Sequence, residues 1–509
     1  MAGPAAVRVR ADGAAEGHAH ATAAGLRRVL LNGLALLGAY VLPRLFTFAA
    51  AVVAARALGV ATFGLYGTVA ALAVILSIVS TLGMMQLLVR EIARSPERAA
   101  ELVGAAHVAK AVSGLVMMGA LAGLAAGLLG DVPEAVLAAL LLGAAYALGS
   151  FVENLGAYVQ AVERMGAWMQ AQALFGIVSG GLGIALVLAT GSLAWFCAAP
   201  LVGQAVALTW LMSRTPPPVR WAWRAPRPRV VGLLIELVPF TLSTIALTAY
   251  YKIDVLLVEQ WRGAAEAGVY AAAYKFVDVA QALALVVAMA VYPRLSRAAA
   301  EVLDGGAAEP GADRAGGAAR RRWAATRVAE LLLLASVPAA GVLWLTRGPV
   351  VDLLFGQAYA ASAGVVAILA PVLPLLALNA LGAYILAAAE RMGLVAAVFS
   401  GALVLNVGLN AALVPGLGAR GAALAMLASE SALAIAMLAA LRRHASAAPS
   451  RRVVGAALLA AGAAAMMAWP TLPALGAAAA YLGAAAAVYA AARVVPVGEW
   501  RLLRRAVVG

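Results

Sequence analysis

The chain has little charge and almost no cysteine. Only 12% of its 509 residues are charged, whereas 64% are hydrophobic, and a soluble globular protein has about one quarter charged residues. This composition predicts a polytopic membrane protein. The single cysteine, Cys197, excludes a disulfide framework and a cysteine-based metal site. The 4 histidines show no spacing typical of zinc ligands, so we expect no metal site.

The motifs of common enzyme classes are also missing. The sequence has no P-loop, no nucleophile elbow and no pair of carboxylates flanking a cleft. We therefore expect a protein that is not an enzyme and that uses no cofactor. The net charge of +14 would suit nucleic acid, but the basic residues are spread over loops between apolar segments, as the positive-inside rule requires. We expect membrane lipids as partners and no nucleic acid.

Fourteen apolar segments are long enough to cross the hydrocarbon core, for which about 20 helical residues suffice. Basic residues concentrate in alternate loops, which places both termini on the cytoplasmic side of the plasma membrane. Within the third segment, Gly119, Gly123 and Gly127 recur every four residues and predict close helix packing. The predicted spans are 29–55, 64–88, 102–129, 135–161, 167–190, 194–213, 231–258, 268–293, 329–346, 361–388, 392–414, 417–441, 453–469 and 474–492.

A faint internal repeat relates the first six spans to the next six. Glu163-Arg164-Met165-Gly166 matches Glu390-Arg391-Met392-Gly393, and Phe63-Gly64-Leu65-Tyr66 matches Ala267-Gly268-Val269-Tyr270. Because the matching spans lie six apart, the two bundles would be related by a pseudo-two-fold axis along the membrane normal. We therefore predict an all-α polytopic membrane protein with two six-helix bundles and two additional C-terminal helices. The predicted parts are a disordered cytoplasmic tail at 1–28, bundles at 29–213 and 231–441, a cytoplasmic linker at 214–230, and the added helices and cytoplasmic tail at 442–509.

The few charges inside the spans are the candidate functional residues. All three lysines, Lys110, Lys252 and Lys275, lie in predicted spans, whereas the loops use arginine. A charge at the bilayer centre costs roughly 2.5–3.5 kcal/mol on insertion scales, so it normally faces a bundle interior or an aqueous cavity. Lys275 and Asp278 share a helix face because they are three apart, whereas Lys252 and Asp254, two apart, point differently.

From this pattern we predict that Arg44, Lys252 and Lys275 line a central, substrate-binding cavity. Asp254 and Asp278 would tune or neutralise these cations. The secondary candidates are Lys110, Glu153 and Asn154. The alternative interpretation is that the charges cancel pairwise and serve only to hold helices together.

Three stretches carry a family resemblance. The run from Ala55 to Tyr66 resembles the "A-R-x-L-G-x-x-x-F-G-x-Y" motif of polysaccharide repeat-unit flippases, and Arg90-Glu91-Ile92-Ala93-Arg94 resembles their "R-E-I-A-R". The stretch from Lys252 to Ser296 is similar to their "D…G-x-Y-x-x-A-Y-x…P-x-L-S-R" signature. These flippases form the oligosaccharide branch of the multidrug/oligosaccharidyl-lipid/polysaccharide exporter (MOP) superfamily.

The resemblance implies a flippase that moves a polyprenyl-diphosphate-linked oligosaccharide across the cytoplasmic membrane by alternating access, for cell-surface polysaccharide biosynthesis. It implies that Arg44, Lys252 and Lys275 meet the diphosphate, with a polysaccharide polymerase and glycosyltransferases as partners. The additional helix pair is similar to the lipid II flippase branch. No ATP-binding motif is present, which leaves coupling to a proton or sodium gradient, or to membrane potential, open.

Two other functions compete with this one. A cation-coupled multidrug exporter of the same superfamily would have a similar architecture, but a cationic drug favours acidic cavity residues without the three basic ones. A non-transporting membrane scaffold has no use for charges inside its spans. The sequence therefore favours the flippase.

Overall fold

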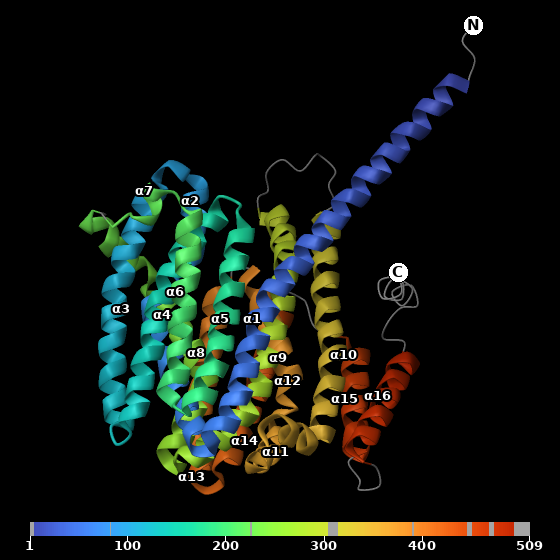
Figure 1. Cartoon of the computed structure of the whole chain (residues 1–509). Coiled ribbons are helices and arrows are strands. Elements are labelled where there is room, and N and C mark those ends of the chain that lie inside the picture. Colours follow the sequence, from blue (N-terminus) through green and yellow to red (C-terminus); the bar gives the residue numbers. More distant parts are fainter. Residues whose placement is uncertain are drawn as a thin grey trace.

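The computed structural model describes residues 5–81, 83–223, 226–303, 314–388, 391–444, 450–467 and 473–492. These residues form sixteen α-helices and two 3₁₀ turns, with no strand among them (Figure 1). Within this described part, nine helical spans are long and apolar enough to cross a membrane, or up to ten when one bent pair counts as a span. The protein is therefore a multi-pass α-helical membrane protein.

The N-terminal half begins with α1 (Ala5–Thr81), which contains the first predicted span and most of the second, with a break at Gly59 between them. Gly59 has φ 76°, a conformation that a glycine adopts without steric penalty. Because α1 begins at Ala5, residues 5–28 are helical, contrary to the disordered tail predicted at 1–28; their many alanines have the highest helix propensity. The half continues with α2 (Met84–Arg94), η1 (Pro96–Arg98), α3 (Ala99–Leu129), α4 (Pro133–Ala161), α5 (Met165–Thr190) and α6 (Leu193–Arg214).

The C-terminal half follows the short helix α7, which lies within the predicted linker. Two of its helices, α11 and α12, meet at a bend of 45° and together form the tenth predicted span. Each of the fourteen predicted spans thus overlaps mainly one helix, apart from 64–88, which runs from α1 into α2, and 361–388, which is formed by α11 and α12. The elements are α7 (Pro217–Arg220), α8 (Arg227–Arg262), α9 (Ala264–Leu303), α10 (Arg314–Phe355), η2 (Gln357–Tyr359), α11 (Ser362–Leu369), α12 (Val372–Ala388), α13 (Met392–Leu417), α14 (Ala419–His444), α15 (Arg451–Met467) and α16 (Ala474–Ala491).

Helix α1 joins the two halves. It packs against α3, α4 and α5 of its own half and against α8 and α9 of the other. The two additional helices, α15 and α16, pack on α10 at the edge of the molecule (Figure 1). Much of the buried surface consists of alanine, valine and leucine, and such small and branched side chains allow the close van der Waals packing that holds helices together in lipid.

Two glycines let α1 and α9 cross in backbone contact. A Cβ atom on Gly64 would lie 1.8 Å from the carbonyl oxygen of Ala264, and one on Gly268 would lie 1.9 Å from the carbonyl oxygen of Val60. The contact is reciprocal, and its two glycines are the ones that the internal repeat pairs. A pseudo-two-fold axis between the bundles brings equivalent residues together in this way. We call this contact the glycine crossing.

Hydrogen bonds of Arg56 and Tyr359 join the halves at the same end as the glycine crossing. The Arg56 guanidinium Nε donates to the carbonyl oxygen of Leu354 at 2.8 Å, at the end of α10. The Tyr359 hydroxyl donates to the carbonyl oxygen of Ala55 at 2.8 Å. Because the positive-inside rule predicts this end to face outward, the structure is closed on its predicted outer side.

The glycines of α3 do not pack as their spacing predicts. A Cβ on Gly119, Gly123 or Gly127 would meet no atom within 4 Å, and all three positions are exposed. The prediction of close helix packing is therefore wrong for contacts within this chain. These glycines face outward beside exposed apolar side chains such as Leu124, which is 44% exposed, so this face of α3 suits lipid.

Candidate functional site

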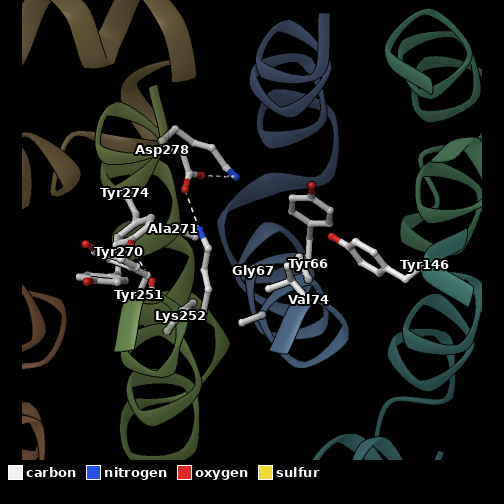
Figure 2. Close-up of a pocket in the computed structure, with 14 residues that line it drawn as sticks. Tyr66, Gly67, Val74, Tyr146, Tyr251, Lys252, Tyr270, Ala271, Tyr274 and Asp278 are labelled. Carbon is white, nitrogen blue, oxygen red and sulfur yellow. Dashed lines mark hydrogen bonds and ion pairs between the residues drawn. The ribbon is translucent and has the colours of Figure 1, made fainter. Parts of the chain in front are cut away.

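A pocket of about 210 Å³ lies where the two halves meet. Residues of α1 and α4 line one side, and residues of α8 and α9 line the other (Figure 2). The pocket lies just beyond the glycine crossing, because Tyr66 and Gly67 follow Gly64 within one helical turn. Its described lining residues are Tyr66, Gly67, Ala70, Ala71, Val74, Tyr146, Tyr251, Lys252, Val255, Tyr270, Ala271, Tyr274, Lys275 and Asp278.

Three charged side chains form the polar centre of this pocket. The Lys252 ammonium lies 2.6 Å from Oδ1 of Asp278, and the Lys275 ammonium lies 3.2 Å from Oδ2 of the same carboxylate. Lys275 and Asp278 share a helix face, as their spacing predicts, whereas Lys252 comes from α8. The side chains of Lys252, Lys275 and Asp278 are 26%, 21% and 29% exposed, respectively. Two cations therefore share one anion at a place that water and a ligand can reach.

Each ammonium group makes a cation–π contact with a tyrosine ring. The Lys252 Nζ lies 4.6 Å from the ring centroid of Tyr274, and the Lys275 Nζ lies 5.7 Å from that of Tyr66. A ring face attracts a cation within about 6 Å. The Tyr274 hydroxyl donates to the carbonyl oxygen of Tyr251, which fixes the ring beneath Lys252. Figure 2 shows Tyr66 and Tyr146 across the pocket from Lys252 and Asp278.

Asp254 lies outside the pocket, although only one residue separates it from Lys252. It is 1% exposed. Its Oδ2 accepts a hydrogen bond from the Tyr270 hydroxyl at 2.8 Å, and its Oδ1 accepts one from Asn410 Nδ2 at 2.8 Å. The Asn410 amide also donates to Asn406 Oδ1 at 3.1 Å. Asp254 is thus a member of a dry polar cluster between α8, α9 and α13, and does not contact either lysine.

Arg44 lies in a different pocket from the two lysines. This second pocket has a volume of about 240 Å³ and lies between α1 and α5. Its described lining includes Thr47, Trp168 and Gln172. The structure therefore does not bring Arg44 together with Lys252 and Lys275 in one cavity, and a ligand would have to reach both pockets to contact all three cations.

The secondary candidates belong to α3, which carries Lys110, and to α4, which carries Glu153 and Asn154. The Lys110 ammonium is completely buried and lies 3.0 Å from Glu153 Oε2 and 2.9 Å from the carbonyl oxygen of Ser150. Asn154 is also fully buried, with 0% exposure. Lys110 and Glu153 therefore fit the alternative interpretation, in which charges pair across helices and hold them together, because each ion has its partner on the neighbouring helix.

Sequence reasoning missed a buried acid in the twelfth span. Glu430 is 0% exposed, and its Oε2 accepts a hydrogen bond from Asn379 Nδ2 at 2.6 Å. The sequence does indicate Glu430, because a lone carboxylate within the apolar segment 417–441 is as unfavourable inside a membrane as the candidate lysines and aspartates. The tyrosines of the pocket were missed for another reason: aromatic residues are common in apolar helices and give no local sign of lining a cavity.

Comparison with known proteins agrees with this architecture. The sequence profile of the polysaccharide biosynthesis protein family matches residues 29–299. No curated protein matches the chain. Among solved structures, lipid II flippase MurJ in an inward closed conformation superposes with a TM-score of 0.67 at 12% identity, covering 94% of this chain and 100% of that one.

Two transporters of the MOP superfamily also share the fold. An inward-facing multidrug resistance MATE family transporter superposes with a TM-score of 0.64 at 14% identity, covering 81% of this chain and 98% of that one. A MOP superfamily transporter from Pyrococcus furiosus, whose binding pocket has reverse polarity, superposes with a TM-score of 0.57 at 16% identity, covering 81% of this chain and 94% of that one. Because the family profile spans more than half of the chain, the protein belongs to the polysaccharide biosynthesis protein family, and it has the fold of the MOP superfamily exporters.

Proposed function

We propose that the protein is a flippase that carries a polyprenyl-diphosphate-linked oligosaccharide across the cytoplasmic membrane by alternating access. Both termini would face the cytoplasm, and the bundles at 29–213 and 231–441 would rock against each other. The product would supply cell-surface polysaccharide biosynthesis, with glycosyltransferases acting before transport and a polymerase after it. Family membership and the exporter fold support this proposal.

The observation that carries the proposal is the pair of lysines between the two halves. Lys252 and Lys275 each bind one of the two carboxylate oxygens of Asp278. The same two ammonium groups can therefore bind neighbouring phosphate oxygens of a diphosphate. A diphosphate cannot cross hydrocarbon unaided. The lysines belong to the C-terminal half, and Tyr66 and Tyr146 of the N-terminal half line the same pocket, so the ligand would bind where the halves move apart.

The glycine crossing supports alternating access. Together with the contacts of Arg56 and Tyr359, it closes the predicted outer end next to the pocket. A transporter needs such a closure to separate the pocket from one side while it is open to the other. The contact is made of backbone and two glycines, so it can form and separate without moving large side chains.

A multidrug exporter is the other function that the fold allows. The Asp278 carboxylate would suit an organic cation, but both of its oxygens already bind ammonium groups. A cationic drug would have to approach two positive charges to reach it. The charge of the pocket therefore favours an anionic ligand.

The proposal is tested with the full chain in proteoliposomes, using a short polyprenyl diphosphate that carries a fluorescent sugar. We expect Lys252→Gln and Lys275→Gln each to slow flipping by about 10-fold or more, because a hydrogen bond to a charged group contributes roughly 1.5–3 kcal/mol. Arg98→Gln is the matched control, since it removes one positive charge from the exposed Arg98–Glu101 pair, and it should flip normally.

In cells, Arg44→Ala and Lys252→Ala should each abolish export of the surface glycan while the protein still inserts into the membrane. The measurements are glycan display on intact cells and the amount of protein in isolated membranes. Normal flipping by both lysine variants, together with normal glycan display, would refute the assigned function.

A further inference from the structure

Asp278 occupies the position that an anionic ligand needs. Each of its two carboxylate oxygens binds a different ammonium group, Oδ1 that of Lys252 and Oδ2 that of Lys275. A phosphate group presents the same kind of acceptor, an anionic oxygen that takes a charge-assisted hydrogen bond of about 2.7–2.9 Å. The diphosphate of the proposed ligand and Asp278 would therefore compete for the same two cations.

The charges of the pocket make this competition necessary. Among its described lining residues, Asp278 is the one carboxylate that faces the two lysines. Asp254 cannot replace it, because Asp254 is buried and its two oxygens bind Tyr270 and Asn410. Two unpaired ammonium groups at the middle of a membrane protein would be strongly unfavourable, so the empty pocket needs the carboxylate.

The ammonium groups can remain in place when the carboxylate leaves. The rings of Tyr274 and Tyr66 lie beneath Lys252 and Lys275 at 4.6 and 5.7 Å. Cation–π contacts of this kind stabilise a cation without bringing in a competing negative charge. Asp278 itself is 29% exposed, so its side chain borders the space into which it would move.

From these observations we propose that Asp278 is a resident counter-ion that the anionic group of the ligand displaces from Lys252 and Lys275. It compensates the two cations while the pocket is empty and leaves them when the ligand binds. The inference rests on the proposed function and deepens it, because it assigns to Asp278 the task of balancing charge in the unloaded carrier. The exchange lowers the affinity for the ligand and thereby helps to release it.

The test measures binding of farnesyl diphosphate, a lipid diphosphate without sugar, to the purified full chain in detergent. Asp278→Asn should bind the probe about 10-fold or more tightly than the wild type, since no carboxylate has to be displaced. Chloride should compete strongly with the probe in this variant and weakly in the wild type, because a small anion can fill the place that the carboxylate vacates. Flipping by Asp278→Asn should be slower despite the tighter binding.

Two further variants keep the test decisive. Glu101→Gln removes one negative charge from an exposed pair and should leave binding unchanged. Should Asp278→Asn fail to fold, Lys275→Gln is compared with the double variant Lys275→Gln/Asp278→Asn, in which Lys252 is the one lysine of the pocket and has no carboxylate partner. The double variant should bind the probe more tightly than the single one, because the remaining lysine is then freed from the carboxylate.

The outcomes separate this inference from the proposed function. Binding by the wild type with equal or weaker binding after the loss of the carboxylate would overturn the counter-ion role and leave the flippase proposal standing. Absence of probe binding in the wild type and in all folded variants would overturn both.

Discussion

Lys252 and Asp254 are two residues apart on α8, yet their surroundings differ in every respect. The Lys252 side chain is 26% exposed and lines the pocket, whereas Asp254 is 1% exposed and lies in a dry cluster. Lys252 shares its carboxylate with a second cation, while Asp254 binds neutral donors from two other helices. The pocket can therefore exchange partners, and the cluster cannot do so without leaving a buried polar group unsatisfied.

Helix geometry produces this difference. Successive residues turn by about 100° around the axis, so residues two apart lie on nearly opposite faces. One face of α8 thus lines the pocket between the halves, and the other packs into the C-terminal half. The comparison predicts that changes in the dry contacts reduce stability, whereas changes in the pocket reduce transport.

The largest loss of stability is expected at the glycine crossing, a buried backbone contact outside the pocket. Gly64→Val places side-chain atoms where the carbonyl oxygen of Ala264 lies, and backbone cannot yield as a flexible side chain would. We expect destabilisation of more than about 3 kcal/mol, seen as a lower melting temperature in detergent and loss of flipping. Gly123→Val is the matched control, because a Cβ there meets nothing within 4 Å. Equal melting of the two variants would contradict the role of the crossing.

A smaller but clear loss is expected for Asp254→Ala. It removes the carboxylate that accepts from the Tyr270 hydroxyl, whereas the Asn410 amide keeps Asn406 as an acceptor, and one unsatisfied buried group costs roughly 1–3 kcal/mol. Lys252→Gln should change the melting temperature little, because its position borders the pocket and water can solvate the new amide. Thermal unfolding of both variants in the same detergent checks the contrast. The comparison fails if Lys252→Gln is the less stable of the two.

The helices could be predicted from the sequence because a bilayer demands long apolar segments with satisfied backbone hydrogen bonds. The break at Gly59 and the bend between α11 and α12 did not disturb that prediction. The N-terminal extension of α1 was missed because composition alone does not distinguish a disordered alanine-rich tail from a helix.

The site could be predicted only in part. A charge inside an apolar span identifies Lys252, Lys275 and Asp278 as candidates, and the spacing of three residues predicts the ion pair between Lys275 and Asp278 on α9. No local pattern reveals that Asp254 pairs with Asn410, which is far away in the sequence. For the same reason the sequence grouped Arg44 with the lysines, whereas the structure places it in a pocket against α5. Partners on distant helices depend on packing, which one sequence does not specify.

The smallest effect is expected from removing one hydroxyl of the dry cluster. Tyr270→Phe deletes a hydrogen bond to Asp254 but keeps the ring, so the carboxylate retains the Asn410 amide as a donor. We expect a loss of about 1–2 kcal/mol, less than for Asp254→Ala, with flipping per folded molecule close to normal. Tyr146→Phe, across the pocket, is the control that should leave stability unchanged. A large loss of flipping in folded Tyr270→Phe would show that the cluster takes part in transport, and the division between dry and exchanging charges would then have to be abandoned.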